Sequence, residues 1–131
     1  MTNNDLAAHD LAAYNKELAR RGFAEVAAGN FDVLRTLLHD DFVEHSPGNP
    51  SGKDAFIEFI AESPFASAGL ELARIIADEE YVVVHYRMTV PGEPRGTAVV
   101  DIFRMIEGKM VEHWDVVQAV PDPEQIPHGM F

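Results

Sequence analysis

Residues able to transfer protons lie in the second half of the chain, on two predicted strands that a short turn joins. The strand from Gly96 to Ile106 is mostly apolar but contains Asp101, and the strand from Lys109 to Val120 contains His113 and Asp115. An ionised carboxylate among apolar neighbours is costly unless it is paired or becomes protonated. These side chains therefore indicate either a cavity with acid/base chemistry or ion pairs on a surface.

Side-chain alternation divides these residues between the two faces of the predicted sheet. Asp101 and Phe103 share one face of their strand. His113 and Asp115 share a face of the next strand, and Trp114 lies on the opposite face. Both faces of this last strand are partly polar, so the pattern leaves open which one points inward. His113 and Asp115 could form a site or an outer ion pair, and Asp101 could equally make a structural salt bridge.

The other histidines give weaker signals. His45 precedes a loop of turn-forming residues, 46–50, where a solvated histidine and a site residue are both reasonable interpretations. His85 is typical of a histidine whose hydrogen bonds are satisfied within a sheet. The sequence contains no close helical pair of metal ligands, no phosphate-binding glycine loop and no dinucleotide-binding motif. It therefore predicts neither a metal site nor a cofactor.

Periodicity and turn formers predict the elements that position these side chains. Helices are expected at 5–28, 31–39 and about 51–60, an extended piece at 41–45, and strands at 70–77, 81–90, 96–106 and 109–120. Tyr14 lies on the apolar face of the first helix. Gly22, inside the same helix, indicates a close approach by another element. Three helices followed by an antiparallel meander predict an α+β fold, with a curled sheet that encloses a pocket.

Composition limits the class of protein. The chain has 131 residues, a formal net charge of −12 and no cysteine. Excess acid argues against nucleic-acid binding, which needs Lys and Arg to neutralise phosphates, and the lack of cysteine excludes disulfides. No apolar run reaches the ~18–20 residues of a membrane span, and the polar start does not resemble a signal peptide. We expect one cytoplasmic domain over 1–131 without a membrane partner, and with a proline-rich tail from about residue 121.

Four segments together resemble the SnoaL-like polyketide cyclase family of the NTF2-like superfamily. They are residues 27–32, 41–47, 100–104 and 108–115, and the resemblance extends from about residue 10 to residue 121. It implies a conical, strongly curved antiparallel sheet wrapped by three helices, commonly paired as a homodimer through the outer face of the sheet. It implies no single reaction, because the superfamily includes cyclases, isomerases, dehydratases, epoxide hydrolases and non-catalytic binding modules.

The related ketosteroid isomerases offer a comparison of individual residues. Their general-base aspartate follows a Val-Glu pair and precedes a proline, and His45 has that place here. Their hydrogen-bond-donating aspartate lies in an Asp-x-x-Arg strand, which Asp101 and Arg104 match. Their tyrosine on the first helix would fall near Gly22 and is missing. The resemblance implies His45 as a base and Asp101 as an acid that an apolar cavity keeps neutral.

We therefore expect a cofactor-independent enzyme that acts on a small or polycyclic carbonyl compound by proton abstraction and enolate stabilisation, in a cyclisation or an isomerisation. The expected catalytic residues are His45 and Asp101. The expected substrate-binding residues are His85, His113, Trp114, Asp115, Phe103 and Tyr14. The alternatives are a non-catalytic small-molecule-binding or dimerisation module and an epoxide hydrolase, of which paired acids in the cavity would be the sign. We also expect a homodimer, because a curled sheet leaves one face partly apolar.

Overall fold

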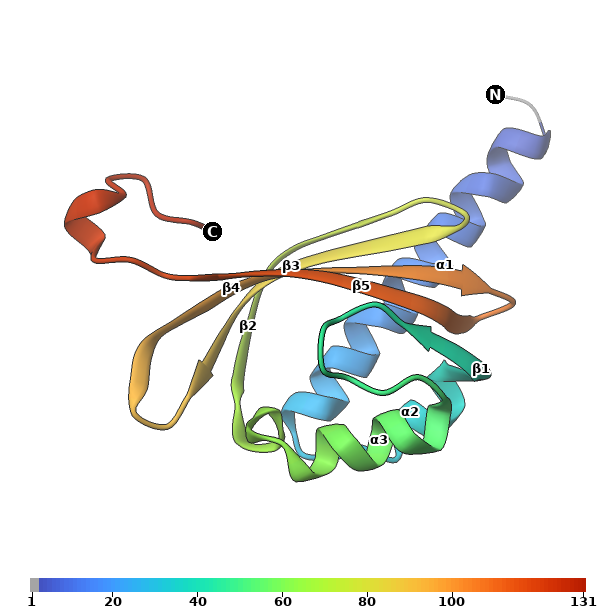
Figure 1. The fold of residues 1–131 in the computed structure, drawn as a ribbon. Coiled ribbons are helices and arrows are strands. Elements are labelled where there is room, and N and C mark those ends of the chain that lie inside the picture. The colour runs from blue at the N-terminus through green and yellow to red at the C-terminus, as the bar shows by residue number, and fades with distance from the viewer. Residues whose placement is uncertain (1–2) are drawn as a thin grey trace.

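The computed structural model describes residues 3–131, and their elements follow the predicted α+β order, with helices first and most strands after them (Figure 1). The helices are α1 (Asn3–Ala27), α2 (Val33–Leu37) and α3 (Lys53–Glu62), with short 3-10 helices η1 (Pro64–Ser67) and η2 (Pro123–Gln125). The strands are β1 (Leu38–Glu44), β2 (Gly69–Ala77), β3 (Tyr81–Val90), β4 (Glu93–Ile106) and β5 (Lys109–Ala119). Within residues 3–131, no helix is both long enough and apolar enough to cross a membrane.

The strands form one mixed sheet in the order β1-β5-β4-β3-β2. Strands β2 to β5 pair antiparallel with their sequence neighbours, as predicted. Strand β1, however, pairs parallel with β5 at the edge of the sheet. The sheet is also not strongly curled. The expected antiparallel cone is therefore corrected to a five-stranded mixed sheet.

Strand β1 begins at Leu38, where the sequence predicted the last turn of a helix. Leu38 has an extended backbone, with φ −88° and ψ 138°, and pairs with Met110 of β5. The side chains of Leu38 and Phe42 are each about 1% exposed. Burying these two apolar side chains against the sheet contributes more free energy than another turn of a short helix. The same pairing brings Glu44 beside His113.

The core lies between the inner face of the sheet and the helices α1, α2 and α3, which cover that face (Figure 1). Ala19 of α1, Phe42 of β1 and Ile57 of α3 contribute to it from the helical side and the sheet edge. The inner side chains of the long strands complete it, namely Val82, Val84, Tyr86, Val99, Phe103, Met105 and Met110. Buried Asn15 of α1 donates hydrogen bonds to the carbonyls of Asp78 and Glu79, at 3.3 and 3.2 Å, and so holds this helix on the β2–β3 turn.

Gly22 lies at a close approach between α1 and α2, which confirms the prediction from its place inside a helix. A Cβ atom added at Gly22 would lie 2.6 Å from Cδ1 of Leu37. Leu37 is itself buried and lines the cavity described below. Glycine costs the helix about 1 kcal/mol relative to alanine, and here that cost allows the two helices to pack closely.

We expect Gly22→Val to lower the free energy of unfolding by ~1–3 kcal/mol, because overpacking against Leu37 outweighs the small gain in helix propensity. Urea denaturation would measure the change. Ala13→Val, on the exposed side of α1, is the matched control for the cost of valine in this helix. Leu37→Val removes the clashing Cδ1, so the double variant should recover part of the loss. Equal destabilisation by Gly22→Val with and without Leu37→Val would contradict this explanation.

Candidate active site

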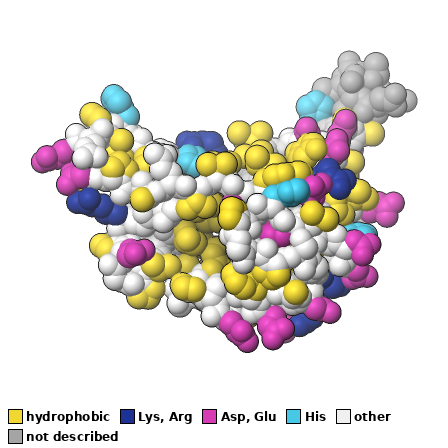
Figure 2. Space-filling model, in the orientation of Figure 1, with side chains coloured by type: hydrophobic (Ala, Val, Ile, Leu, Met, Phe, Trp, Pro, Cys, Tyr) yellow, Lys and Arg dark blue, Asp and Glu magenta, His cyan; other side chains and the backbone are white. Residues whose placement is uncertain are grey.

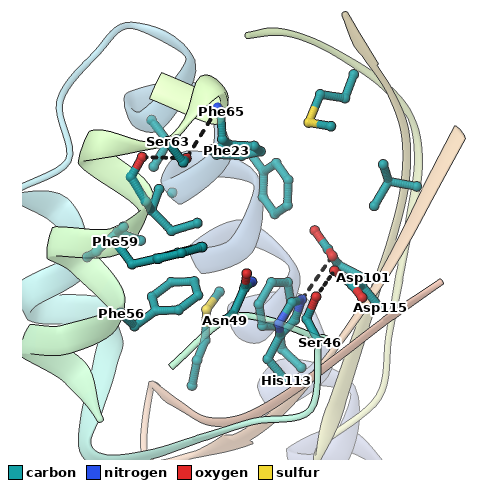
Figure 3. Close-up of a pocket in the computed structure, with 18 of the residues that line it drawn as sticks. Phe23, Ser46, Asn49, Phe56, Phe59, Ser63, Phe65, Asp101, His113 and Asp115 are labelled. Atoms are coloured by element: carbon teal, nitrogen blue, oxygen red, sulfur yellow. Dashed lines mark hydrogen bonds and ion pairs between the residues drawn. The ribbon is translucent and has the colours of Figure 1, made fainter. Parts of the chain in front are cut away.

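A cavity of about 400 Å³ lies between the inner face of the sheet and the helices. Figure 2 shows this hollow, with hydrophobic side chains on its walls. Its aromatic side chains come from several elements: Phe23 of α1, Phe56 and Phe59 of α3, Phe65 of η1 and Phe103 of β4. Polar groups are concentrated on the wall formed by β4, β5 and the loop after β1, where the close-up in Figure 3 labels Ser46, Asn49, Asp101, His113 and Asp115.

Asp101 lies at the centre of this polar wall. It projects from the inner face of β4, between Val84 of β3 and Asp115 of β5, and is 6% exposed. Tyr86 donates its hydroxyl hydrogen to Oδ2 of Asp101 at 2.9 Å, and Nε2 of His113 donates to Oδ1, also at 2.9 Å. Both carboxylate oxygens of this buried acid therefore have partners, which makes its burial tolerable.

His113 connects Asp101 to a second buried acid, Glu44. Its Nδ1 donates to Oε1 of Glu44 at 2.7 Å, and the side chain of Glu44 is completely buried. The backbone N–H of Ser46 donates to the same oxygen at 2.9 Å. The imidazole ring also stacks on Phe103, with ring centres 4.7 Å apart. Two hydrogen bonds and one stacking contact thus fix the position and the plane of this ring.

The pKa values of the cluster follow from burial and from these contacts. Burial lowers the pKa of His113, but hydrogen bonds to Asp101 and Glu44 outweigh it and raise the pKa to about 10. Burial raises the pKa of Asp101, against the hydrogen bonds from His113 and Tyr86, and the negative charge of Asp115 acts in the same direction as burial. Burial and the charge of Asp101 also raise the pKa of Tyr86 well above its usual value, so this hydroxyl stays a donor.

Asp115 is the second carboxylate that faces the cavity. Among the described residues, its side-chain hydrogen-bond partner is Ser46, whose Oγ donates to Oδ2 at 2.8 Å. One oxygen of each of Asp101 and Asp115 and one nitrogen of His113 lie within 4.8 Å of one another. These three could hold a metal ion by their type and spacing. His113 binds metals only when deprotonated, so such an ion would have to displace the proton between His113 and Asp101.

His45 and Trp114 lie outside the cavity. Trp114 projects from the outer face of β5, since it alternates with His113, and the ring of His45 stacks on it with centres 4.8 Å apart. Nε2 of His45 pairs with Oε2 of Glu112 at 2.6 Å, and Arg104 donates to the other oxygen of Glu112. The structure therefore does not bring the expected base, His45, next to the expected acid, Asp101.

His85 and Tyr14 are also away from the cavity. His85 lies on the outer face of β3, where it contacts Arg74 and stacks on Phe131. Tyr14 is exposed on α1 and lies beside the β4–β5 turn at Gly108. Of the eight expected site residues, the structure brings four together along the cavity: Asp101, Phe103, His113 and Asp115.

Sequence reasoning did not select Glu44, Ser46 or Tyr86 as site residues. The alternation of side chains between the two faces of the sheet places each of them on the inner face. Glu44 and Ser46 follow buried Phe42 at steps of two, and Tyr86 shares the face of Val84 rather than that of His85. Only the pairing of β1 with β5 reveals that Glu44 meets His113, because 69 residues separate them in sequence.

Comparisons with known proteins agree with this architecture. A family model described as SnoaL-like domain matches residues 19–113. No curated protein matches the chain. An NTF2-like protein of unknown function from Burkholderia xenovorans LB400 superposes with a TM-score of 0.77 at 21% identity, covering 91% of this chain and 97% of the other.

Two further solved structures carry provisional functional assignments. One is assigned as a ketosteroid isomerase from Kribbella flavida, with a TM-score of 0.73, 20% identity and 88% of each chain covered. The other is assigned as a SnoaL-like polyketide cyclase from Jannaschia sp. CCS1, with a TM-score of 0.69, 18% identity, and 82% of this chain and 87% of that chain covered. At these identities the likeness is one of fold.

We expect Glu44→Gln to lower the pKa of His113, because it removes the negative charge of Glu44, to which Nδ1 of the imidazolium donates. The midpoint of the His113 titration, followed by NMR of the ring, should fall by ~1–2 pH units. Glu62→Gln, an exposed change of the same type at the end of α3, is the matched control and should leave the midpoint unchanged. An unchanged midpoint in Glu44→Gln would contradict the ion pair.

The ion pair of His113 with Glu44 also makes the free energy of unfolding depend on pH. The pKa of His113 is raised in the folded chain, so the imidazolium stabilises the fold fully below pH 6.5, its ordinary pKa. This contribution is lost as pH rises through about 10. The free energy of unfolding should decline over this range, and the decline should be smaller in Glu44→Gln than in the wild type.

Proposed function

The chain belongs to the SnoaL-like domain family and has the NTF2-like fold, and on this basis we propose that it catalyses cofactor-independent acid/base chemistry on an apolar carbonyl compound. One observation carries the proposal: two carboxylates, Asp101 and Asp115, lie side by side on the polar wall of a mainly apolar cavity. Neighbouring acids in an apolar site share protons, so one can act as an acid while the other acts as a base.

Asp101 is the acid in this proposal. Burial and the nearby charge of Asp115 favour its neutral form, in which it can donate a hydrogen bond or a proton to a carbonyl oxygen. His113 acts through Asp101, because its ring has no free N–H for the ligand: one nitrogen is bound to Glu44 and the other to Asp101. We therefore assign His113 as a positioning residue.

Asp115 is the base. Ser46 donates to one of its oxygens, and the rest of its lone pairs are available to the cavity. Asp115 takes the role that the sequence suggested for His45, whose ring stacks on Trp114 outside the cavity. Removal of a proton from the carbon next to the carbonyl, while Asp101 donates to the oxygen, forms an enol. In a β,γ-unsaturated ketone this product is a dienol, and its reprotonation at the γ-carbon moves the double bond, which is an isomerisation. In a compound with a second carbonyl group, the α-carbon of the enol can attack that carbonyl, which is an aldol cyclisation.

Two other functions have support from particular observations. Paired acids also suit epoxide hydrolysis, in which one carboxylate activates a water and an acid protonates the epoxide oxygen. A non-catalytic binding module is supported by the internal pairing of the cluster, since Asp101, His113, Glu44 and Tyr86 already bond to one another. Substrate panels that include both carbonyl compounds and epoxides distinguish the three functions.

We also propose a homodimer that pairs the outer faces of two sheets. Four apolar residues that pair across neighbouring strands form a row on the outer face, namely Ile76, Val83, Ile102 and Trp114. Val116, one row away, is 67% exposed, and Ile76 is 61% exposed. An apolar sheet face of this kind suits a twofold contact with a second copy of the same surface.

Exchange of α-protons tests the acid/base proposal without knowledge of the natural substrate. We expect the chain to accelerate exchange of the α-hydrogens of 2-tetralone, or of another small cyclic ketone of a panel, in heavy water followed by NMR. Asp115→Asn should reduce the accelerated rate by ~10²–10⁴-fold, because it removes the base, and Asp101→Asn should reduce it as well. Asp41→Asn, an exposed aspartate on β1, is the matched control and should retain the rate.

Three outcomes separate the candidate functions. Exchange that Asp115→Asn leaves unchanged would contradict the assigned base. Binding of ketones without exchange would favour the binding module. Hydrolysis of styrene oxide or cyclohexene oxide that depends on both acids, in the absence of ketone exchange, would favour the epoxide hydrolase.

The dimer has its own test. Sedimentation at micromolar concentration should give the mass of two chains, and Val116→Glu should give one chain, because it introduces a charge into the apolar contact. Ile106→Glu introduces the same charge on an exposed side chain at the β4–β5 turn and should remain dimeric. A monomeric wild type at micromolar concentration would contradict the proposal.

A further inference from the structure

We propose that the cavity selects its ligands by charge, so that it accepts apolar compounds whose polar head is neutral or, preferentially, a protonated amine, and excludes carboxylates. The inference rests on the proposed function in one respect, that the same polar wall receives the ligand. It goes further because it names the charge and the hydrogen-bonding character of the compounds that fit. Three properties of the cavity support it.

The first property is an excess of negative charge. Asp101, Asp115 and, directly behind His113, Glu44 provide three carboxyl groups, whereas His113 provides the single cation of the cluster. No Lys or Arg lines the cavity in the part of the chain that the structure describes. Even with Asp101 protonated, the cluster retains one excess negative charge. A monovalent cation neutralises it, and a carboxylate ligand doubles it in surroundings where charges are weakly screened.

The second property is a set of free acceptor positions on Asp115. His113 donates to Asp101 and Glu44, Tyr86 donates to Asp101, and Ser46 donates to Asp115. These donors are therefore already in use, and the lone pairs of Asp115 that Ser46 does not occupy are open to a ligand. An ammonium group brings three donors and a hydroxyl group brings one, whereas an ionised carboxylate brings none. The open lone pairs of Asp115 consequently favour a ligand whose head carries a hydrogen-bond donor.

The third property is the division of the cavity into a polar and an aromatic side. Phe56 and Phe59 of α3 and Phe65 of η1 lie across the cavity from Asp101 and Asp115 (Figure 3). A fused-ring body packed on these phenylalanines would direct a head group at one end towards the two aspartates. Phe103, which also lines the cavity, can add a cation–π contact to an ammonium head.

Three compounds on one tetralin skeleton test the proposal by binding alone. They are 2-aminotetralin, which is protonated at neutral pH, 2-tetralol, which is neutral, and tetralin-2-carboxylate, which is anionic. We expect calorimetry at pH 7 and low salt to give affinities in this order, with the amine bound at least ~10-fold more tightly than the carboxylate. Asp115→Asn should reduce this ratio, and the exposed control Asp41→Asn should preserve it.

A ratio below ten in the wild type, a ratio that Asp115→Asn does not change, or failure of the amine to bind would each overturn the proposal. Measured α-proton exchange keeps it distinct from the proposed function. Exchange of 2-tetralone without charge preference would overturn the charge selection alone. Charge preference without any exchange would overturn the acid/base chemistry and leave the charge selection intact.

Discussion

The buried ion pair of His113 with Glu44 and Asp101 is the constraint on which the rest of this structure depends. A fully buried glutamate, a buried aspartate and a histidine can coexist in an apolar interior only if they pair with one another, because an unpaired charge there costs several kcal/mol. Among the described residues, Oε1 of Glu44 has two donors and its buried Oε2 has none. The three residues come from β1, β4 and β5. The parallel pairing of β1 with β5 is therefore linked to the chemistry of the site, since it carries Glu44 to Nδ1 of His113.

Burial of this cluster in an apolar cavity supports the proposed acid/base chemistry. The apolar cavity, with phenylalanines on α1, α3 and η1, weakens screening and so magnifies each charge on the polar wall. In that environment Asp101 has a raised pKa, while His113 is held in its charged form. Two neighbouring carboxyl groups in different surroundings can take different protonation states, so that one can serve as an acid and the other as a base. The close packing of α1 on α2 at Gly22 positions the helical side of the same cavity.

Local patterns in the sequence predicted much of this fold and part of the site. Strand β3 was predicted with its observed bounds, and alternation grouped Asp101 with Phe103 and His113 with Asp115, which are the residues that meet in the cavity. What local patterns could not supply was the choice of inner face and the long-range pairing of β1. One step along β5 separates His113, inside, from Trp114, outside. One step along the chain likewise separates Glu44 from His45. The carboxylate of Glu44 lies inside, whereas the ring of His45, the residue that the family resemblance suggested as the base, stacks on Trp114 outside.

The central claim is that the polar wall holds an acid and a base side by side, next to a histidine that stays charged. Neutron diffraction from a deuterated crystal at pD near 6 would locate these protons directly. We expect deuterium on both ring nitrogens of His113 and one deuteron on the carboxyl group of Asp101. A singly protonated His113, or a carboxyl group of Asp101 that carries no deuteron, would contradict it.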